Sequence, residues 1–134
     1  MLSKVFKAYD VRGIYPAPLD EQDAWRIGHA TARFLLAKGP GRTVVVGRDM
    51  RTSSPSLVRA LKDGILAAGA DVADVGMVDT PFVYFAVNHL GAAGGIQTTA
   101  SHNPAQYNGF KICGAGARPV GQDTGLLEIR TMAE

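Results

Sequence analysis

The stretch TVVVGRDMRTSSP, residues 43–55, runs from a strand pattern into a helix start, and this order decides the fold class. Thr43–Gly47 is a run of β-branched residues closed by glycine, which is typical of a short buried strand. Ser54 suits a helix N-cap, and Pro55 suits the first helical turn because that turn does not need its N–H. The residues between predict a loop that leaves the carboxyl end of a strand.

The same alternation continues on both sides of this stretch. Asp20 predicts the N-cap of a preceding helix that ends at KGPG, residues 38–41, and Val5–Tyr9 followed by DVRGIYPAP, residues 10–18, predicts a short apolar piece and a loop. Downstream, the patterns predict strands at 71–75, 95–99 and 109–113, with a helix from Thr80 to about Leu90. The order predicts an α/β domain: three α/β/α layers around a mostly parallel, mixed four-stranded sheet.

The bulk composition narrows the class of protein. The chain has 134 residues, 46% hydrophobic residues and a formal charge of +2, which is typical of one globular domain. Its basic residues are dispersed, so we expect no nucleic-acid partner. No apolar run is long enough to cross a bilayer and no signal-peptide pattern opens the chain, so we expect no membrane partner and a cytoplasmic location. The single Cys113 excludes an internal disulfide and continues an apolar strand, so we expect it to be buried.

Two loops leave the carboxyl ends of predicted strands, where open α/β sheets bind ligands. They are GRDMR, residues 47–51, and TASHNPAQYNG, residues 99–109. If the strands are parallel, Arg48 or Arg51 approaches Ser101, and a guanidinium matches the oxygens of a phosphate. A phosphate site is one interpretation of Ser101.

Two other interpretations of Ser101 remain open on the residues alone. Serine and asparagine are ordinary turn residues, so Ser101 can be a loop hydroxyl with no chemical role. A hydrolase nucleophile is less favoured, because His102 is adjacent in sequence and no G-x-S-x-G pattern is present. The three histidines of the chain, including His29 and His89, form no metal signature.

Three motifs in order carry a resemblance to a known family. TASHNP, residues 99–104, with YNGFKI, residues 107–112, resembles the phosphoserine loop of the α-D-phosphohexomutases, which include phosphomannomutases and phosphoglucomutases. AYDVRG, residues 8–13, resembles the family's N-terminal motif, and VGRDMR, residues 46–51, resembles its first strand and loop. The resemblance spans about residues 6 to 112 and implies the first domain of a four-domain enzyme.

The resemblance also implies roles for individual residues. It implies that Ser101 carries a phosphoryl group and exchanges it with a hexose monophosphate through a bisphosphorylated sugar, which moves phosphate between the 1- and 6-positions. The implied catalytic residues are Ser101, Lys111, Arg12 and His102, and the implied substrate-binding residues are Tyr9, Asn103, Arg48 and Arg51. The implied reaction class is an intramolecular phosphotransferase, an isomerase of carbohydrate metabolism.

The resemblance implies Mg²⁺ and a hexose 1,6-bisphosphate as cofactor and activator. The phosphoryl oxygen on Ser101 is the one metal ligand that we predict on this chain, because the family's aspartate-rich metal loop belongs to the second domain and has no counterpart here. We therefore predict that residues 1–134 form a single domain that is inactive without the remaining domains, with an interdomain helix starting at about residues 122–134. The sugar, mannose or glucose, stays open. The alternative is a non-catalytic module of the same fold that binds phosphosugars or a partner chain.

Overall fold

The computed structural model describes residues 2–134 as five strands, four α-helices and three short 3₁₀ helices. The strands are β1 (Val11–Ile14), β2 (Thr43–Arg48), β3 (Asp71–Met77), β4 (Gly94–Thr98) and β5 (Tyr107–Gly114). The α-helices are α1 (Glu21–Lys38), α2 (Ser54–Ala67), α3 (Thr80–Leu90) and α4 (Leu126–Ala133). The 3₁₀ helices are η1 (Leu2–Lys4), η2 (Ala115–Ala117) and η3 (Gln122–Thr124).

The strands form one mixed sheet in the order β1-β5-β4-β2-β3. β2 pairs in parallel with both β3 and β4, as helix-connected strands do. β5 returns antiparallel to β4, with Gln97 opposite Lys111, and β1 pairs antiparallel with the far side of β5. The carboxyl ends of the parallel strands therefore meet at one edge of the sheet, which we call the carboxyl edge.

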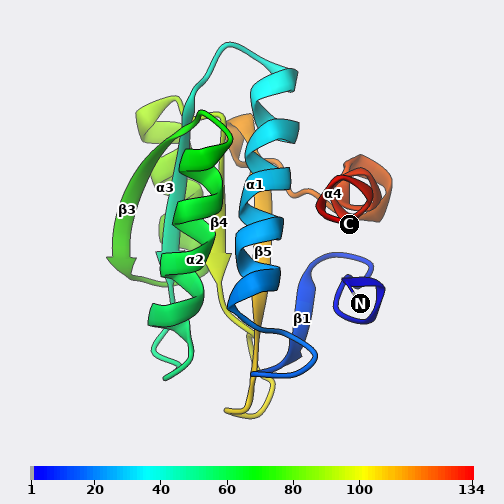
Figure 1. Ribbon diagram of the computed structural model, residues 1–134. Helices are drawn as coiled ribbons and strands as arrows, with labels where there is room; N and C mark the ends of the chain where they lie inside the picture. Colours follow the sequence, from blue (N-terminus) through cyan, green and yellow to red (C-terminus); the bar gives the residue numbers. More distant parts are fainter. Residues whose placement is uncertain (1) are drawn as a thin grey trace.

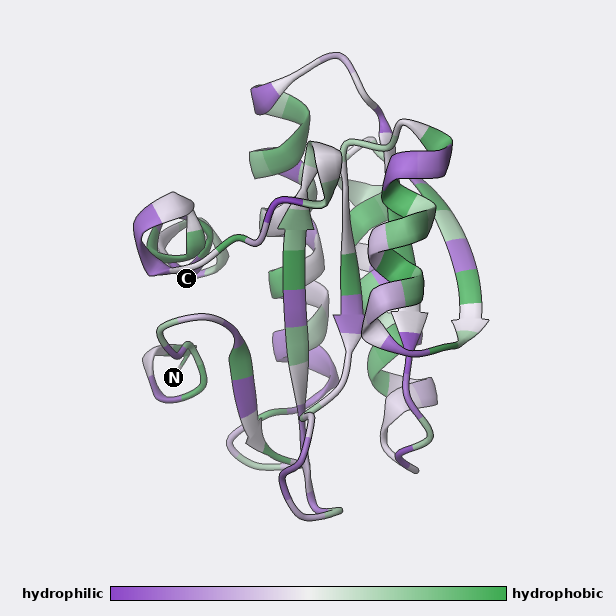
Figure 2. Ribbon diagram, turned by 180° about the vertical axis from the view of Figure 1, so that it is seen from behind, coloured by the Kyte–Doolittle hydropathy of each residue, from purple (hydrophilic) through white to green (hydrophobic). Residues whose placement is uncertain are grey.

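Helices cover the two faces of the sheet unequally. α1 and α2 lie side by side over one face, and α4 packs beside α1 (Figure 1). On the other face, α3 covers β2 and β4, whereas none of the four α-helices within residues 2–134 lies in front of β5 and β1 (Figure 2). The larger core cluster lies under α1, α2 and α4, and the smaller one lies under α3. This architecture confirms the predicted α/β/α class and leaves part of one face uncovered.

The predicted number of strands was wrong, because the sheet has five strands instead of four. β1 lies inside the stretch that proline and glycine predicted to be a loop. Its prolines come after Ile14, so they interrupt no hydrogen bond of the strand. Its partner is about a hundred residues away, with Val11 opposite Phe110 and Arg12 opposite Gly109. A strand of four residues with such a distant partner leaves little signal in the sequence.

The two predicted helix starts differ in outcome. Asp20 caps α1 as predicted, because its carboxylate accepts from the N–H of Asp23 while Asp23 accepts from the N–H of Asp20. Ser54 is the first residue of α2, and its N-cap position is Ser53, which makes no side-chain capping bond. The hydroxyl of Ser54 instead donates to Asp49 (3.0 Å), so this serine stabilises the loop before the helix and does not cap the helix.

Two glycines allow α1 and α2 to pack at backbone contact. A Cβ on Gly28 would lie 2.3 Å from the carbonyl oxygen of Leu61, and a Cβ on Gly64 would lie 2.1 Å from that of Trp25. Neither position has room for a side chain, because in each case a Cβ would collide with the backbone of the other helix. The two helices therefore cross in direct backbone contact.

Cys113 is fully buried in the core under α3, as the sequence predicted. Burial raises the pKa of its thiol to about 11, although a backbone hydrogen bond from Gly95 acts in the opposite direction. The thiol is therefore protonated at neutral pH and packs as a small apolar side chain.

Candidate functional site

Ser101 lies at the carboxyl edge, in the loop of residues 99–106 that joins β4 to β5, which we call the serine loop. Its side chain is exposed, and its backbone takes a left-handed conformation with φ of 58°. This conformation is uncommon outside glycine, and such positions occur often at functional sites. The N–H of Ser101 donates to the hydroxyl of Thr99 (3.0 Å), which ties its backbone to the start of the loop.

Asp49 connects the serine loop to the loop after β2. Its carboxylate accepts hydrogen bonds from the Thr99 hydroxyl (2.7 Å), the Ser54 hydroxyl (3.0 Å) and the backbone N–H of Arg51 (3.1 Å). It also forms an ion pair with the Arg51 Nε at 3.1 Å. One carboxylate therefore holds both loops and the start of α2 at fixed positions.

Arg51 extends from the loop after β2 into the serine loop, and its side chain is only 6% exposed. An arginine side chain has five N–H donors. One of them, on Nε, donates to Asp49. The two Nη atoms donate to four serine-loop and strand carbonyl oxygens: Ser101 (2.9 Å), Asn103 (2.9 Å), Pro104 (2.7 Å) and Tyr107 (3.2 Å). The predicted proximity of Arg51 and Ser101 is present, but every donor is already bonded within the chain.

Lys111 and Arg12 point to the uncovered face of the sheet. Lys111 lies between Phe110 and Ile112, which belong to the core under α1 and α2, so alternation turns Lys111 to the opposite face. Arg12 follows the core residue Val11 and is turned the same way. Gly109 lies opposite Arg12 and has no room for a Cβ, which would meet the carbonyl oxygen of Val11 at 1.9 Å. The uncovered face therefore carries two cations beside the serine loop.

Arg12 shares a hollow of about 310 Å³ with the serine loop. Lys4, Lys7, Arg12, Asn103 and Tyr107 contribute to its lining. The Arg12 guanidinium lies 3.7 Å from Asp10, and its Nε is buried without a hydrogen-bond partner among the described residues. An unpaired buried donor among three cationic side chains favours a negatively charged occupant.

The remaining predicted residues lie at different places around this site. Asn103 shapes the serine loop, because its side-chain nitrogen donates to the carbonyl oxygen of Ala100 (2.7 Å). His102 is exposed next to Ser101, and its imidazole makes no hydrogen bond within residues 2–134. Tyr9 is 83% exposed and lines a different hollow with Gly121. The structure thus places His102 and Asn103 at Ser101 and leaves Tyr9 apart.

Arg48 lies at the end of β2 on the face that α1 and α2 cover, since it follows the core residue Val46 by two positions. Its charge acts on Asp74: burial alone would raise the pKa of that carboxyl, but hydrogen bonds from Lys62 and the Gly76 N–H, with the charges of Lys62 and Arg48, lower it. Arg48 and Lys111 therefore lie on opposite faces of the sheet.

Sequence reasoning missed Asp49, Thr99 and Asn108 as parts of the site. Asn108 is fully buried, and its side-chain nitrogen donates to the hydroxyls of Ser53 (2.8 Å) and Ser54 (3.0 Å). A signal was available for Asn108, because an asparagine inside the apolar strand pattern YNGFKI needs a buried partner. Asp49 lies within the loop GRDMR, but in the sequence only the two arginines of that loop suggested partners of a phosphate.

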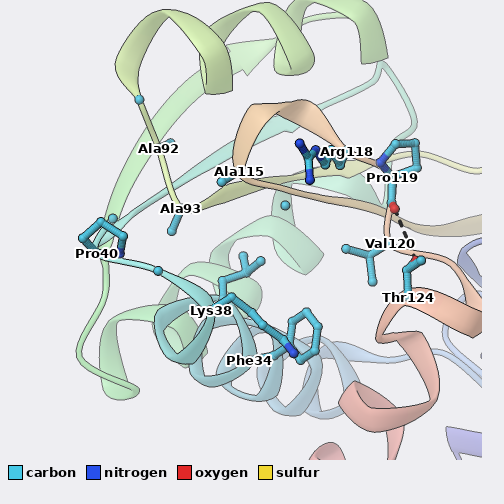
Figure 3. Close-up of a pocket in the computed structure, with 15 residues that line it drawn as sticks. Phe34, Lys38, Pro40, Ala92, Ala93, Ala115, Arg118, Pro119, Val120 and Thr124 are labelled. Atoms are coloured by element: carbon cyan, nitrogen blue, oxygen red, sulfur yellow. Dashed lines mark hydrogen bonds between the residues drawn. The ribbon is translucent and has the colours of Figure 1, made fainter.

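Another hollow, larger than the one beside Arg12, lies at the opposite edge of the sheet, where the parallel strands begin, which we call the amino edge. Its volume is about 550 Å³, and Figure 3 shows it between Phe34 and Lys38 of α1 and the segments that carry Ala93 and Ala115. Glycine, alanine and proline dominate the lining, and Lys38 and Arg118 are its charged residues. No lining residue is an acid, a histidine or a cysteine, so this hollow lacks groups for acid–base or metal chemistry.

The described residues contain no group of three or more histidine, cysteine or acidic side chains that could hold a metal ion. Asp49, the acidic residue next to the serine loop, already accepts four hydrogen bonds. These residues therefore do not form a Mg²⁺ site by themselves. Among residues 2–134, no helix has the length and apolar character needed to cross a membrane.

Known proteins of similar sequence and structure share this domain. The family profile described as phosphoglucomutase/phosphomannomutase, α/β/α domain I, matches residues 3–134. The phosphomannomutases of Escherichia coli K12 and Klebsiella pneumoniae are each 50% identical over 129 residues, which is 96% of this chain and 27% and 80% of those proteins. A crystal structure of a phosphoglucomutase/phosphomannomutase family protein from Burkholderia thailandensis has a TM-score of 0.87 and 44% identity, covering 99% of this chain and 31% of that one.

The fold and the site together define the class of protein. It is an α/β/α domain with an exposed serine in a loop at the carboxyl edge of its sheet. The chain belongs to the phosphoglucomutase/phosphomannomutase family, as its domain I. It spans about a quarter to a third of the length of most of the relatives that it matches, 28% in the case of an Escherichia coli phosphomannomutase.

Proposed function

We propose that this chain is the phosphoserine-bearing domain of a hexose phosphomutase that interconverts 1-phospho and 6-phospho sugars of mannose, glucose or both. The observation that supports this most is the position of Ser101: an exposed residue at the carboxyl edge, in a loop that Arg51 holds by hydrogen bonds and whose Asn103 lines a hollow with the cation Arg12. Relatives that are 50% identical are named phosphomannomutase, which is consistent with an isomerase of carbohydrate metabolism.

The proposed reaction moves a phosphoryl group off the serine and back. The Ser101 Oγ–P bond breaks while a new P–O bond forms to a hydroxyl of the hexose monophosphate. A neutral Lys111 amine takes up the proton of that hydroxyl and passes it to the Ser101 oxygen that the phosphoryl group leaves, so the products are a serine hydroxyl and a hexose 1,6-bisphosphate. After reorientation, the other phosphoryl group returns to Ser101 Oγ, and the proton returns to the sugar oxygen. Phosphoryl transfer depends mainly on positioning and charge stabilisation, which loops and cations of this kind supply.

The proposal also assigns a role to each of the other site residues. Arg12 stabilises the charge on the transferring phosphoryl group, and its unpaired Nε and its place among Lys4 and Lys7 support this role. His102 and Asn103 hold the shape around Ser101, and Tyr9 contacts substrate from the N-terminal segment. Arg48 faces away from Lys111, so we propose that its contribution to substrate binding is through long-range charge.

We propose that the activity needs parts that these residues do not supply. An Escherichia coli relative is more than three times as long as this chain, which covers 28% of it, and the described residues form no metal site. Mg²⁺ would then be held mainly by residues of the remaining domains, with the Ser101 phosphoryl oxygen as the ligand from this chain. We also propose that α4 begins the connection to the next domain, that residues 1–134 alone are inactive, and that the enzyme is cytoplasmic.

The test is phosphoryl transfer to Ser101. The chain, supplied with the remaining domains, is incubated with glucose or mannose 1,6-bisphosphate and its intact mass is measured. We expect the mass to rise by one phosphoryl group, and Ser101→Ala to abolish that rise. An unchanged mass in the presence of all domains and Mg²⁺ would instead favour a non-catalytic module that binds phosphosugars or a partner chain.

A further inference from the structure

The Arg51 guanidinium gathers carbonyl oxygens, and this fixes the direction of the peptide groups in the serine loop. In a planar trans peptide, the C=O and the N–H point to opposite sides. The carbonyl of Ser101 points at Arg51, so the N–H of His102 in the same peptide points away from it. The carbonyl of Pro104 also points at Arg51, and the N–H of Ala105 points away likewise.

The two outward N–H groups have no partner. Within residues 2–134, neither the N–H of His102 nor that of Ala105 donates a hydrogen bond to backbone or side chain. Both residues are exposed. A backbone N–H carries a partial positive charge, so N–H groups of one loop that make no bond within the chain can donate to an anion bound there.

A buried guanidinium is needed for this arrangement. Four carbonyl oxygens directed at one point would repel one another, and in a poorly solvated loop base that repulsion is strong. The Arg51 charge removes the repulsion, and Asp49 in turn holds the guanidinium in place. A lysine at this position would keep the positive charge. It has only three N–H donors, all on one nitrogen atom, whereas arginine has five on a planar guanidinium.

We propose that Arg51 is a positioning residue: it turns the carbonyl oxygens of the serine loop inward and thereby presents the N–H groups of His102 and Ala105 to the phosphoryl group on Ser101. This inference rests on the proposed function and deepens it. It also replaces the direct contact between Arg51 and substrate that the sequence predicted, because no Arg51 donor is free to make that contact.

The experiment measures the phosphoserine itself and needs no turnover. The chain is produced with phosphoserine incorporated at position 101, and a ³¹P NMR titration gives the second pKa of its phosphate. N–H groups that donate to the dianion favour the charged form, so this pKa should lie about one unit below the value near 6 of an unstructured phosphoserine. The same titration is run on Arg51→Lys, Arg51→Gln and Arg42→Lys. His102→Gln is included so that titration of the neighbouring imidazole is separated from that of the phosphate.

The variants separate geometry from charge. Arg51→Lys keeps the charge and loses the fork, so we expect it to move the pKa of the phosphate most of the way back to about 6, nearly as far as Arg51→Gln. Arg42 also donates to a carbonyl oxygen, that of Gly69, but lies at an exposed place outside the site. Arg42→Lys should therefore leave the pKa unchanged. A low pKa retained in Arg51→Lys but lost in Arg51→Gln would overturn the proposal, since charge alone would then explain the effect.

A second measurement does not depend on any variant folding. In ¹H–¹⁵N spectra of the phosphorylated chain, the amide protons of His102 and Ala105 should move downfield as the phosphate becomes a dianion. The proposal would equally be contradicted if the chemical shifts of these amide protons did not change as the phosphate titrates. Failure of hexose bisphosphate to phosphorylate Ser101 would instead count against the proposed function, while leaving both of these readouts intact.

Discussion

The two edges of the sheet differ in the side chains that connect their loops. At the carboxyl edge, Asp49, Arg51 and Asn108 link segments fifty or more residues apart through partly buried charged and polar hydrogen bonds. At the amino edge, glycine and alanine leave a hollow of about 550 Å³ with few polar groups. The larger hollow therefore has fewer groups that can take part in a reaction, and the candidate site is distinguished by its bonded polar groups and not by its volume.

Removal of the Ser101 hydroxyl is the change with the largest expected effect. With all domains present, Ser101→Ala should lower mutase turnover by on the order of a thousandfold or more, because the group that carries the phosphoryl is lost. The matched change at the amino edge is Thr124→Val, which also removes one hydroxyl from a hollow. It should leave turnover unchanged within error. If both variants lost turnover to the same extent, the two edges would not differ in their importance for the reaction.

The reactivity of Cys113 tests how inert the end of β5 that lies toward the amino edge is. Burial raises the pKa of its thiol from the ordinary 9.0 to about 11, so the thiolate fraction at pH 8 falls by about a hundredfold. We expect labelling of native chain by a thiol-specific disulfide reagent at pH 8 to be slower by at least this factor than labelling in denaturant. Comparable rates in the two conditions would show that the thiol is accessible and the prediction wrong.

Loss of Asn108 tests the bonded network at the carboxyl edge. Asn108→Ala leaves the hydroxyls of Ser53 and Ser54 without their donor and should lower the free energy of unfolding by about 1–3 kcal/mol. Asn88 is exposed, so Asn88→Ala should change that free energy by less than about 0.5 kcal/mol. Urea denaturation followed by circular dichroism gives both values, and a similar small change in both would mean that the network adds no stability.

Lys38 provides the smallest expected effect, at the amino edge. Its ammonium lies 5.0 Å from the centre of the Phe34 ring, and at an exposed site such a contact contributes about 0.5–1 kcal/mol. Lys38→Met should lower stability by no more than that and should not alter turnover. A marked loss of turnover would assign the amino edge a role in the reaction.

The sequence predicted the parts of this domain that depend on local pattern. The β-branched run of β2 and the capping box at Asp20 are set by neighbours within a few positions, and both are present. β1 was missed because four residues form a strand only against β5, about a hundred residues later. Motif resemblance located Ser101, since the motif is contiguous.

The contacts of Arg51 could not be predicted from the sequence. They depend on which way four carbonyl groups point, and those directions follow from the fold of a loop fifty residues away. The sequence supported only the expectation that Arg51 and Ser101 are neighbours. Whether a guanidinium meets a phosphate or the backbone of the loop that carries it is a matter of three-dimensional geometry.

The position of β5 between β4 and β1 affects the order in which the domain can assemble. β1 emerges first during synthesis but has no partner in the sheet until β5 arrives, and pairing over such a separation makes loop closure slow. The parallel strands β2 and β4, with α1 and α2, can pack earlier. Arg12, on β1, thus reaches its place in the sheet only when the last strand is added, so a chain that stops before Tyr107 would lack the strand that positions Arg12.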